Sequence, residues 1–274
     1  MPSLSSQAHG AASRAADSTW LERLTRGGFI GYGVIHLLFA YLIIRIAFAG
    51  KAADGDQSGA LHALAEKPFG TALIVVIVVG LAAMTIWQIF EAIVGHRSER
   101  GRHRVYERVV SAGRAAFYAY LGWTGIKVLR GKTASSADTQ ENASQDLMVS
   151  GAGRFTVALA GVAVAAIGAG LLVYGVTKKF EKHLKTGQMT ARMRTLSRRL
   201  GVAGYAAKGV AYATAGVLLV TAAVQYDPDK ARGLDAALRA LAEQAYGPWL
   251  LALAALGIAA YGLFSIVQAR YRKV

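Results

Sequence analysis

Long uncharged stretches rich in Ala, Val, Leu and Gly alternate with short charged clusters along the chain. A helix needs about 20 mainly apolar residues to cross the hydrocarbon core of a bilayer. Most of the stretches reach or approach this length. They cover residues 27–44, 68–90, 115–126, 155–176, 209–226 and 244–269. The pattern predicts an all-α, polytopic integral membrane protein with six transmembrane helices.

The third stretch is too short to span a membrane by itself, because its 12 residues between Arg114 and Lys127 rise only about 18 Å. We expect this helix to extend over about 110–130, with both cations reaching towards opposite interfaces. A buried helix in a soluble part of the protein is the competing interpretation, since length alone does not exclude it.

One nine-residue motif occurs three times, which indicates internal repeats. The three copies align without gaps and are YGVIHLLFA (32–40), RAAFYAYLG (114–122) and KGVAYATAG (208–216). The fifth position of the motif holds His36, Tyr118 and Tyr212. The first position holds Tyr32, Arg114 and Lys208. The spacing predicts three tandem helical-hairpin repeats, each made of two spans.

The predicted organisation is a small, polar, disordered tail at 1–19, followed by membrane repeats at 20–97, 104–182 and 192–274. The loop inside the first repeat contains GALHALAEKPFG (59–70), and that of the third contains GLDAALRALAEQAYGP (233–248). Their apolar residues recur at helical spacing, which predicts short amphipathic helices at the membrane interface. The corresponding segment 133–153 is polar and Ser-rich, and we expect it to be less ordered than the other two loops.

Composition supports a membrane environment. Of the 274 residues, 54% are hydrophobic and 17% are charged, against about 25% charged in a typical soluble domain. The mean hydropathy is +0.35. The absence of cysteine excludes disulfides, thiolate metal sites and cysteine nucleophiles.

The net charge of +15 is unevenly distributed between the two predicted sides. The N-terminal tail, the second-to-third and fourth-to-fifth connections and the C-terminus together hold 21 of the 31 Lys and Arg residues, and only 6 of the 16 acids. Basic loops remain on the cytoplasmic side of bacterial membranes. We therefore predict a multi-pass protein of the bacterial plasma membrane with both termini in the cytoplasm.

Three motifs carry a resemblance to a known family. They are G-Y-A-A-K-G-V-A-Y opening the third repeat, K-K-F-E-K-H-L…M at 178–189 and Y-G-L-F…Q-A-R-Y-R at 261–272. In their order and spacing the chain resembles the bacterial integral membrane family known as domain of unknown function 1206. The resemblance implies three two-helix repeats in the plasma membrane and supplies no catalytic residues. The first repeat departs from the pattern, with His36 where the family has Tyr.

Several polar residues within the spans are candidates for binding. His36 is the one histidine inside a predicted span. Ionisable groups within a membrane often serve a function, although a histidine at the position of Tyr118 and Tyr212 also suits a packing role. Arg45 and Lys127 occupy matching places near the outer ends of two spans, as an anion-attracting rim or as cations that extend to the interface. Glu91, near the inner end of the second span, suits proton coupling or pairing with the basic loop.

The basic linker between the fourth and fifth spans is a candidate for contact with anionic lipid headgroups, through Lys178, Lys179, Lys182 and Lys185. No recognition fold for nucleic acid is visible. His62 and Glu66 share one face of a short helix, but nothing completes a metal site. The sequence predicts no cofactor and no metal.

The ionisable residues within the spans are single and scattered, whereas catalysis needs two or three reactive groups that converge. We therefore expect a non-catalytic membrane module that binds lipids, preferentially anionic ones at the cytoplasmic face, or a membrane-protein partner. The alternative is a channel or transporter with a polar path between the repeats, because repeats are common in transporters.

Overall fold

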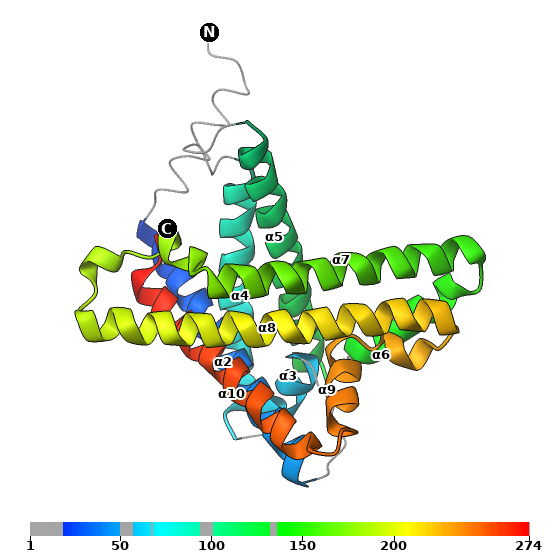
Figure 1. Cartoon of the computed structure of the whole chain (residues 1–274). Coiled ribbons are helices and arrows are strands. Elements are labelled where there is room, and N and C mark those ends of the chain that lie inside the picture. Colours follow the sequence, from blue (N-terminus) through cyan, green and yellow to red (C-terminus); the bar gives the residue numbers. More distant parts are fainter. Residues whose placement is uncertain (1–18, 50–56, 67, 94–100, 132–135, 274) are drawn as a thin grey trace.

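The structure is a computed structural model that describes residues 19–49, 57–66, 68–93, 101–131 and 136–273 (Figure 1). Within these ranges the chain is helical and forms no β-sheet, which confirms the all-α prediction. The predicted disordered tail lies outside the described residues, except for Thr19. The long helices are α2 (Thr19–Ala49), α4 (Gly70–Ile93), α5 (Gly101–Leu129), α7 (Gly151–Val176), α8 (Ala191–Gln225) and α10 (Gly247–Tyr271).

Five of these helices are long and apolar enough to cross a membrane, judged by length and composition. The segments are Thr25–Phe48, Gly70–Ile93, Gly151–Val176, Ala191–Gln225 and Gly247–Tyr271. Their number and their exposed apolar side chains are consistent with a membrane protein. Helix α5 is not among them, because Arg114 and several Tyr, Gly and Thr residues make even its less charged part, after the first turns, too polar.

In each repeat one short helix connects the two long helices. These short helices are α3 (Gln57–Ala65), α6 (Ser136–Met148) and α9 (Leu234–Ala242). The predictions of helices within 59–70 and 233–248 are thus confirmed in outline. Segment 133–153 was expected to be less ordered, but its described part contains the regular helix α6, and residues 133–135 lie outside the described residues. Contacts distant in sequence hold α6 in place. Tyr120 donates a hydrogen bond to Ser136 at 2.7 Å. Arg232, next to the 3₁₀ turn η3 (Pro228–Ala231), pairs with Asp138 and Glu141.

The closest pairs of long helices join neighbouring repeats (Figure 1). Helix α4 packs on α5, α7 on α8, and α10 on α2. Each pair combines the second long helix of one repeat with the first of the next, and the third repeat closes back onto the first. Figure 1 shows the three pairs running in different directions and crossing near the middle of the molecule.

Glycines allow these pairs to approach closely. A Cβ added to Gly33 of α2 would lie 2.7 Å from the carbonyl oxygen of Gly262 in α10. Likewise, a Cβ on Gly168 of α7 would lie 2.7 Å from the carbonyl oxygen of Gly209 in α8. Small residues that bring backbones together are typical of helix pairs in lipid.

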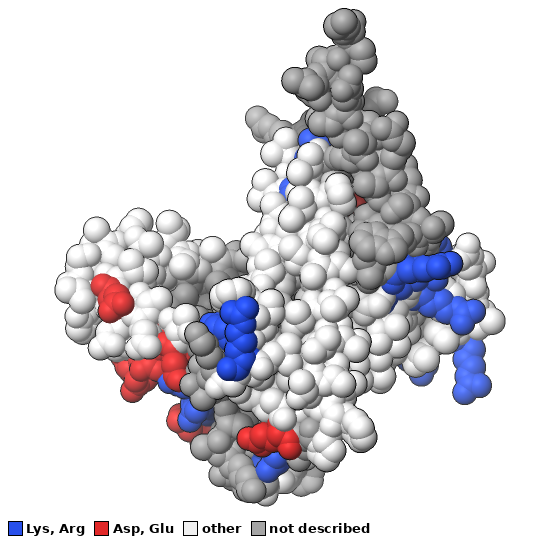
Figure 2. Space-filling model, turned by 180° about the vertical axis from the view of Figure 1, so that it is seen from behind, with Lys and Arg blue, Asp and Glu red and all other residues white. Residues whose placement is uncertain are grey.

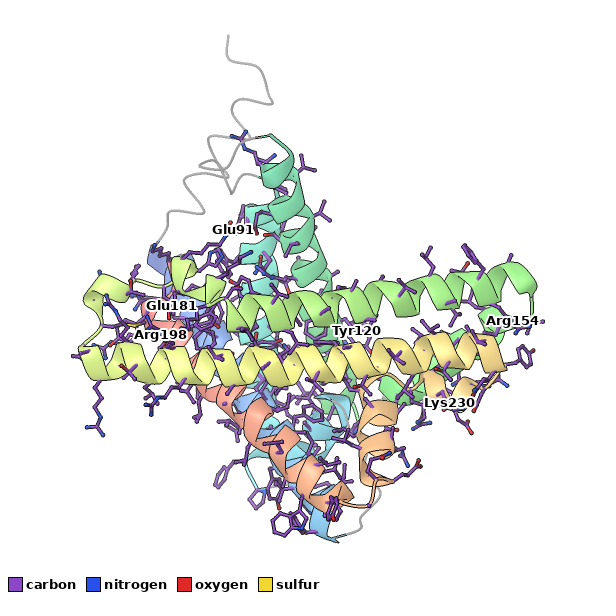
Figure 3. The ribbon with its side chains drawn as sticks, viewed as in Figure 1. Glu91, Tyr120, Arg154, Glu181, Arg198 and Lys230 are labelled. Atoms are coloured by element: carbon purple, nitrogen blue, oxygen red, sulfur yellow. The ribbon has the colours of Figure 1, made fainter. Side chains whose placement is uncertain are left out.

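The start of α2, the end of α10 and the basic linker meet at one end of the molecule, which we call the basic end. The linker contains the 3₁₀ turns η1 (Lys179–His183) and η2 (Thr186–Gln188). Lys185 donates its backbone N–H to the carbonyl of Tyr271 at 2.7 Å, and Lys273 donates to that of His183 at 2.9 Å. A hydrogen bond from Arg198 lowers the pKa of Glu181 below its usual range (Figure 3).

The opposite end, formed by α3, α6, η3 and α9, is richer in acids, and we call it the acidic end. In Figure 2, a group of Lys and Arg lies at the right edge without acids beside it, whereas Asp and Glu lie at the left and at the bottom together with further Lys and Arg, and a largely uncharged surface lies between the two regions. This polarity matches that of a protein that spans an apolar layer.

We predict that Gly168→Ala weakens the fold by about 1–3 kcal/mol, because its methyl group meets backbone atoms of α8 that cannot move independently. Gly113→Ala is the matched control, since nothing lies within 4 Å of a Cβ there and alanine favours a helix by about 1 kcal/mol. Thermal unfolding in detergent should separate the two variants. Equal stability of both would contradict the close packing of α7 on α8.

Candidate functional site: a cationic and aromatic central chamber

Side chains from four long helices meet where the helix pairs cross. The ring of Tyr32 in α2 lies 5.2 Å from that of Tyr118 in α5 and 6.1 Å from that of Tyr261 in α10, measured between centroids. Lys208 of α8 donates a hydrogen bond from Nζ to the hydroxyl of Tyr32 at 3.0 Å. Tyr32, Arg114 and Lys208 share one position of the repeat motif, so each first helix turns this position towards the centre.

Lys208 is the most unusual residue of this cluster. Only 8% of it is exposed, and its Nζ lies 4.1 Å from the ring centroid of Tyr261 and 5.8 Å from that of Tyr212. Within the described residues, no carboxylate forms an ion pair with it. A buried cation without a counter-ion is costly, and cation–π contacts offset part of that cost.

His36 lies directly beneath Tyr32 in the same helix. Its Nδ1 is 2.8 Å from the carbonyl oxygen of Tyr32, and its ring packs against those of Tyr32 and Tyr261 at 4.3 and 4.9 Å. Because a carbonyl only accepts hydrogen bonds, Nδ1 carries the proton in the neutral ring. The other nitrogen, Nε2, is buried without a hydrogen-bond partner.

A small cavity of about 40 Å³ adjoins this cluster towards the basic end. Tyr32 and Tyr261 line it, as do Arg114, Arg272 and the buried Gln268. A cavity needs about 10–15 Å³ to hold one water molecule, so this one has room for a small polar group. We call this cavity, together with Lys208 and His36, the central chamber.

The central chamber is positively charged. Arg114, Arg272 and Lys208 contribute cations, and no carboxylate is among the residues that line the cavity. Arg272 lies over the rings of Phe29 and Trp87, and its Nε is buried without a hydrogen bond. The acid Glu107 stands nearby in α5 but pairs with Lys182 at 3.6 Å. Such a set of donors suits an anion, since guanidinium groups bind carboxylate and phosphate oxygens strongly.

Comparison with known proteins agrees with this threefold construction. The family model described as Domain of Unknown Function (DUF1206) matches residues 27–95, 109–178 and 203–272. The chain belongs to this family. It is 30% identical over 257 residues to "Uncharacterized protein YxxB" of Bacillus subtilis (strain 168), and the match covers 92% of each chain. No solved structure matches.

The three DUF1206 segments place the central residues in register. Tyr32, Arg114 and Lys208 are each the sixth residue of their matched segment. Position within the repeat therefore determines which side chains reach the centre.

The structure brings together three of the residues that the sequence suggested for binding in this DUF1206 chain. His36 and Tyr118 are buried beside Tyr32, and Tyr212 is half-buried within reach of Lys208. Arg45 and Lys127 are half-buried and lie 13 residues beyond Tyr32 and Arg114, roughly 20 Å along their helices towards the acidic end.

The other suggested residues lie at the basic end. Glu91 is half-buried near the end of α4 (Figure 3). Lys178, Lys179 and Lys182 are exposed, and Lys185 is half-buried. None of these four lysines lines the cavity of the central chamber.

Sequence reasoning missed Lys208 as a site residue, because it counted Lys208 with the basic loop that precedes the fifth span. In the structure Lys208 is instead buried in the middle of α8. The repeat alignment contained the signal, since it placed Lys208 level with Arg114 and Tyr32. Tyr174, Tyr205 and Tyr261 were missed because aromatic residues in apolar helices are normally packing residues.

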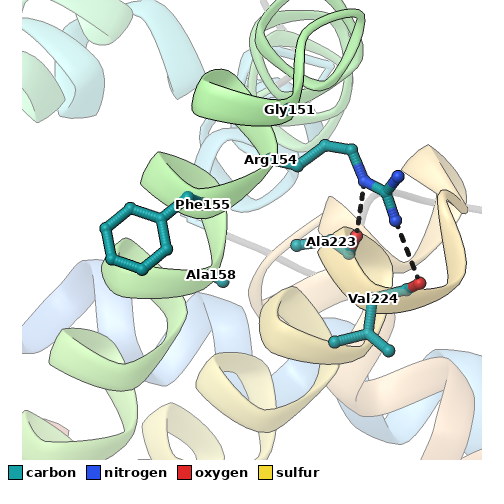
Figure 4. A pocket seen from close by; sticks show the side chains of 6 residues that line it. All are labelled: Gly151, Arg154, Phe155, Ala158, Ala223 and Val224. Atoms are coloured by element: carbon teal, nitrogen blue, oxygen red, sulfur yellow. Dashed lines mark hydrogen bonds between the residues drawn. The ribbon is translucent and has the colours of Figure 1, made fainter.

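A second, larger hollow of about 380 Å³ lies at the acidic end of α7 and α8 (Figure 4). Arg154 donates hydrogen bonds there to the carbonyls of Ala223 and Val224, at 3.2 and 3.3 Å. These carbonyls belong to the last turn of α8, where carbonyl groups have no N–H partner within the helix. Arg154 therefore has a structural explanation as a cap of α8.

We predict that Lys208→Met raises the thermal unfolding temperature of the ligand-free protein, by an amount equivalent to about 1–4 kcal/mol. Methionine has a similar length and removes a charge that costs about 2.5–3.5 kcal/mol at the centre of a membrane helix. Lys179→Met, at an exposed site, should change stability little. A lower unfolding temperature for Lys208→Met would show that Lys208 mainly supports the fold.

Proposed function

We propose that this chain is a non-catalytic membrane protein that binds an anionic group in the central chamber. The observation that carries the proposal is the buried ammonium group of Lys208, which contacts a hydroxyl and aromatic rings but no carboxylate among the described residues. Ionisable residues are rare inside membranes and usually mark a binding site or an ion path. A bound anion supplies the missing counter-charge.

The surrounding groups suit the same ligand. Arg114 and Arg272 offer planar donors from α5 and from the end of α10, and both border the same cavity as Tyr118. Charge-assisted hydrogen bonds from such groups are roughly twice as strong as neutral ones. A phosphate or carboxylate group therefore matches the chamber better than a neutral or cationic ligand does.

The proposal includes six spans, arranged as three two-span repeats with both termini in the cytoplasm. Helix α5 is the sixth span, because it packs along α4 and its first turns lie with the other basic segments. The basic end faces the cytoplasm of the bacterial plasma membrane by the positive-inside rule. Its exposed residues Lys178 and Lys179 contact anionic headgroups, at about 1 kcal/mol for each well-placed cation.

A channel or transporter is the second candidate. It is favoured by the position of the chamber where three repeats converge, since transporters place their sites at repeat interfaces. The cavity of about 40 Å³ admits no ion with its hydration shell, so this conformation suits binding better than conduction. Anion flux into proteoliposomes that is lost in Lys208→Met would favour transport.

Membrane orientation is testable because the chain has no cysteine. We predict that a single cysteine at Gln145, exposed on α6, reacts with an impermeant thiol reagent added to intact cells. One at Gln188, exposed in the linker, should react only after permeabilisation. The reverse labelling pattern would contradict the proposed orientation.

Anion binding is testable with inorganic phosphate. At 100 times its Kd, a ligand stabilises the folded state by about 2.7 kcal/mol, so phosphate should raise the unfolding temperature of the purified protein at constant ionic strength. We predict that Lys208→Met abolishes this rise and that Lys179→Gln retains it. A rise of equal size in all three proteins would place phosphate outside the chamber.

A further inference from the structure

The first and third repeats share an aromatic pair that links their two long helices. In the first, the rings of Phe29 in α2 and Trp87 in α4 lie 5.8 Å apart with an interplanar angle of 65°. In the third, the rings of Tyr205 in α8 and Phe264 in α10 lie 5.8 Å apart at 66°. Near-identical geometry at two places indicates equivalent contacts.

The second repeat lacks this pair. Phe29, Ser111 and Tyr205 are each the third residue of their matched family segment. Trp87, Gly170 and Phe264 each lie eight residues before the end of theirs. Ser111 and Gly170 thus replace two aromatic rings with a hydroxymethyl group and a hydrogen atom.

The second repeat is open on the side of α7, whereas Ser111 on α5 is buried, with 1% of it exposed. Helices α5 and α7 scarcely touch, whereas α2 packs on α4 and α8 on α10. Ile167 of α7 is 58% exposed, while its equivalents Met84 and Tyr261 are 0% and 8% exposed. Nothing lies within 4 Å of a Cβ placed on Gly170. We call the exposed strip of α7 at Ile167 and Gly170, on the side towards α5, the α5–α7 seam.

The seam leads to the central chamber. Tyr174 lies one helical turn beyond Gly170, on the same face of α7, and lines the chamber cavity. Arg114 lines the same cavity from α5, one turn beyond Ser111. The seam is therefore apolar along α7 and cationic where it meets the chamber.

We infer that an anionic membrane lipid occupies the α5–α7 seam, with its phosphate group at Arg114 and an acyl chain along Ile167 and Gly170. This inference rests on the proposed anion-binding function and names its ligand. The cationic side chain of Arg114 favours the phosphate group, and the uncharged residues Ile167 and Gly170 favour the acyl chain.

The test fills the seam and leaves the cations in place. The protein, purified in mild detergent, is incorporated into nanodiscs of mixed phosphatidylglycerol and phosphatidylcholine, and bound lipid is counted by native mass spectrometry after release. Wild type should retain one phosphatidylglycerol in preference to phosphatidylcholine. Gly170→Phe, which restores a ring at the position of Trp87 and Phe264, should reduce this retention at least tenfold.

The matched control is Gly113→Phe, which adds the same ring to α5 where nothing lies within 4 Å of a Cβ. It should retain phosphatidylglycerol as wild type does. Ile167→Trp is a second way to fill the seam, at an exposed residue, and should also lose the lipid if Gly170→Phe does not fold. Equal retention by wild type and the filled variants would overturn the inference.

A parallel measurement with inorganic phosphate separates this inference from the proposed function. The filled variants should still be stabilised by phosphate, because Lys208, Arg114 and Arg272 are unchanged. A wild type that responds to phosphate but retains no phosphatidylglycerol would overturn the lipid inference and leave the anion site intact. A wild type that responds to neither would overturn both.

Discussion

A single ammonium group, buried where three pairs of helices cross, constrains the centre of this structure. Lys208 has the hydroxyl of Tyr32 and the face of Tyr261 as its close partners. A cation–π contact contributes about 2 kcal/mol when it is desolvated, which is less than the cost of burying an ion. The aromatic residues around Lys208 therefore reduce the free-energy cost of burying its charge without removing it, and the remaining cost is the basis of the proposed affinity for an anion.

The way the helices pair explains how this centre forms. Each repeat packs its second long helix against the first long helix of the next repeat, and the last repeat closes onto the first. One position of the first helix is thereby turned inwards three times. Glycines at Gly33, Gly168, Gly209 and Gly262 permit the close approach. This pairing between repeats does not by itself hold together the two long helices of one repeat, so their contact depends on local side chains. The second repeat lacks two aromatic rings there, and α5 and α7 scarcely touch.

Hydrophobic pattern and spacing were sufficient to predict the helical class, the long apolar helices and the repeats, because these depend on local composition. They failed for features that depend on contacts between residues distant in the sequence. The segment that forms α6 was expected to be less ordered because it is polar. In the structure two of its acids, Asp138 and Glu141, pair with Arg232, which lies about 90 residues away in the sequence. Lys208 looked like a boundary, because a search for uncharged stretches places every cation at an end. Pairing between repeats has no local signal.

The repeats differ most at the position where identical residues would be least tolerable. Three lysines at the centre would bring like charges together, and two unit charges 4 Å apart repel by about 4 kcal/mol at an effective dielectric constant of 20. The chain instead places Tyr32, Arg114 and Lys208 there. The phenol accepts a hydrogen bond from the ammonium, and Arg114 lines the cavity. A threefold scaffold thus presents one cationic cluster with chemically distinct sides, which would let the proposed anion bind in a single orientation.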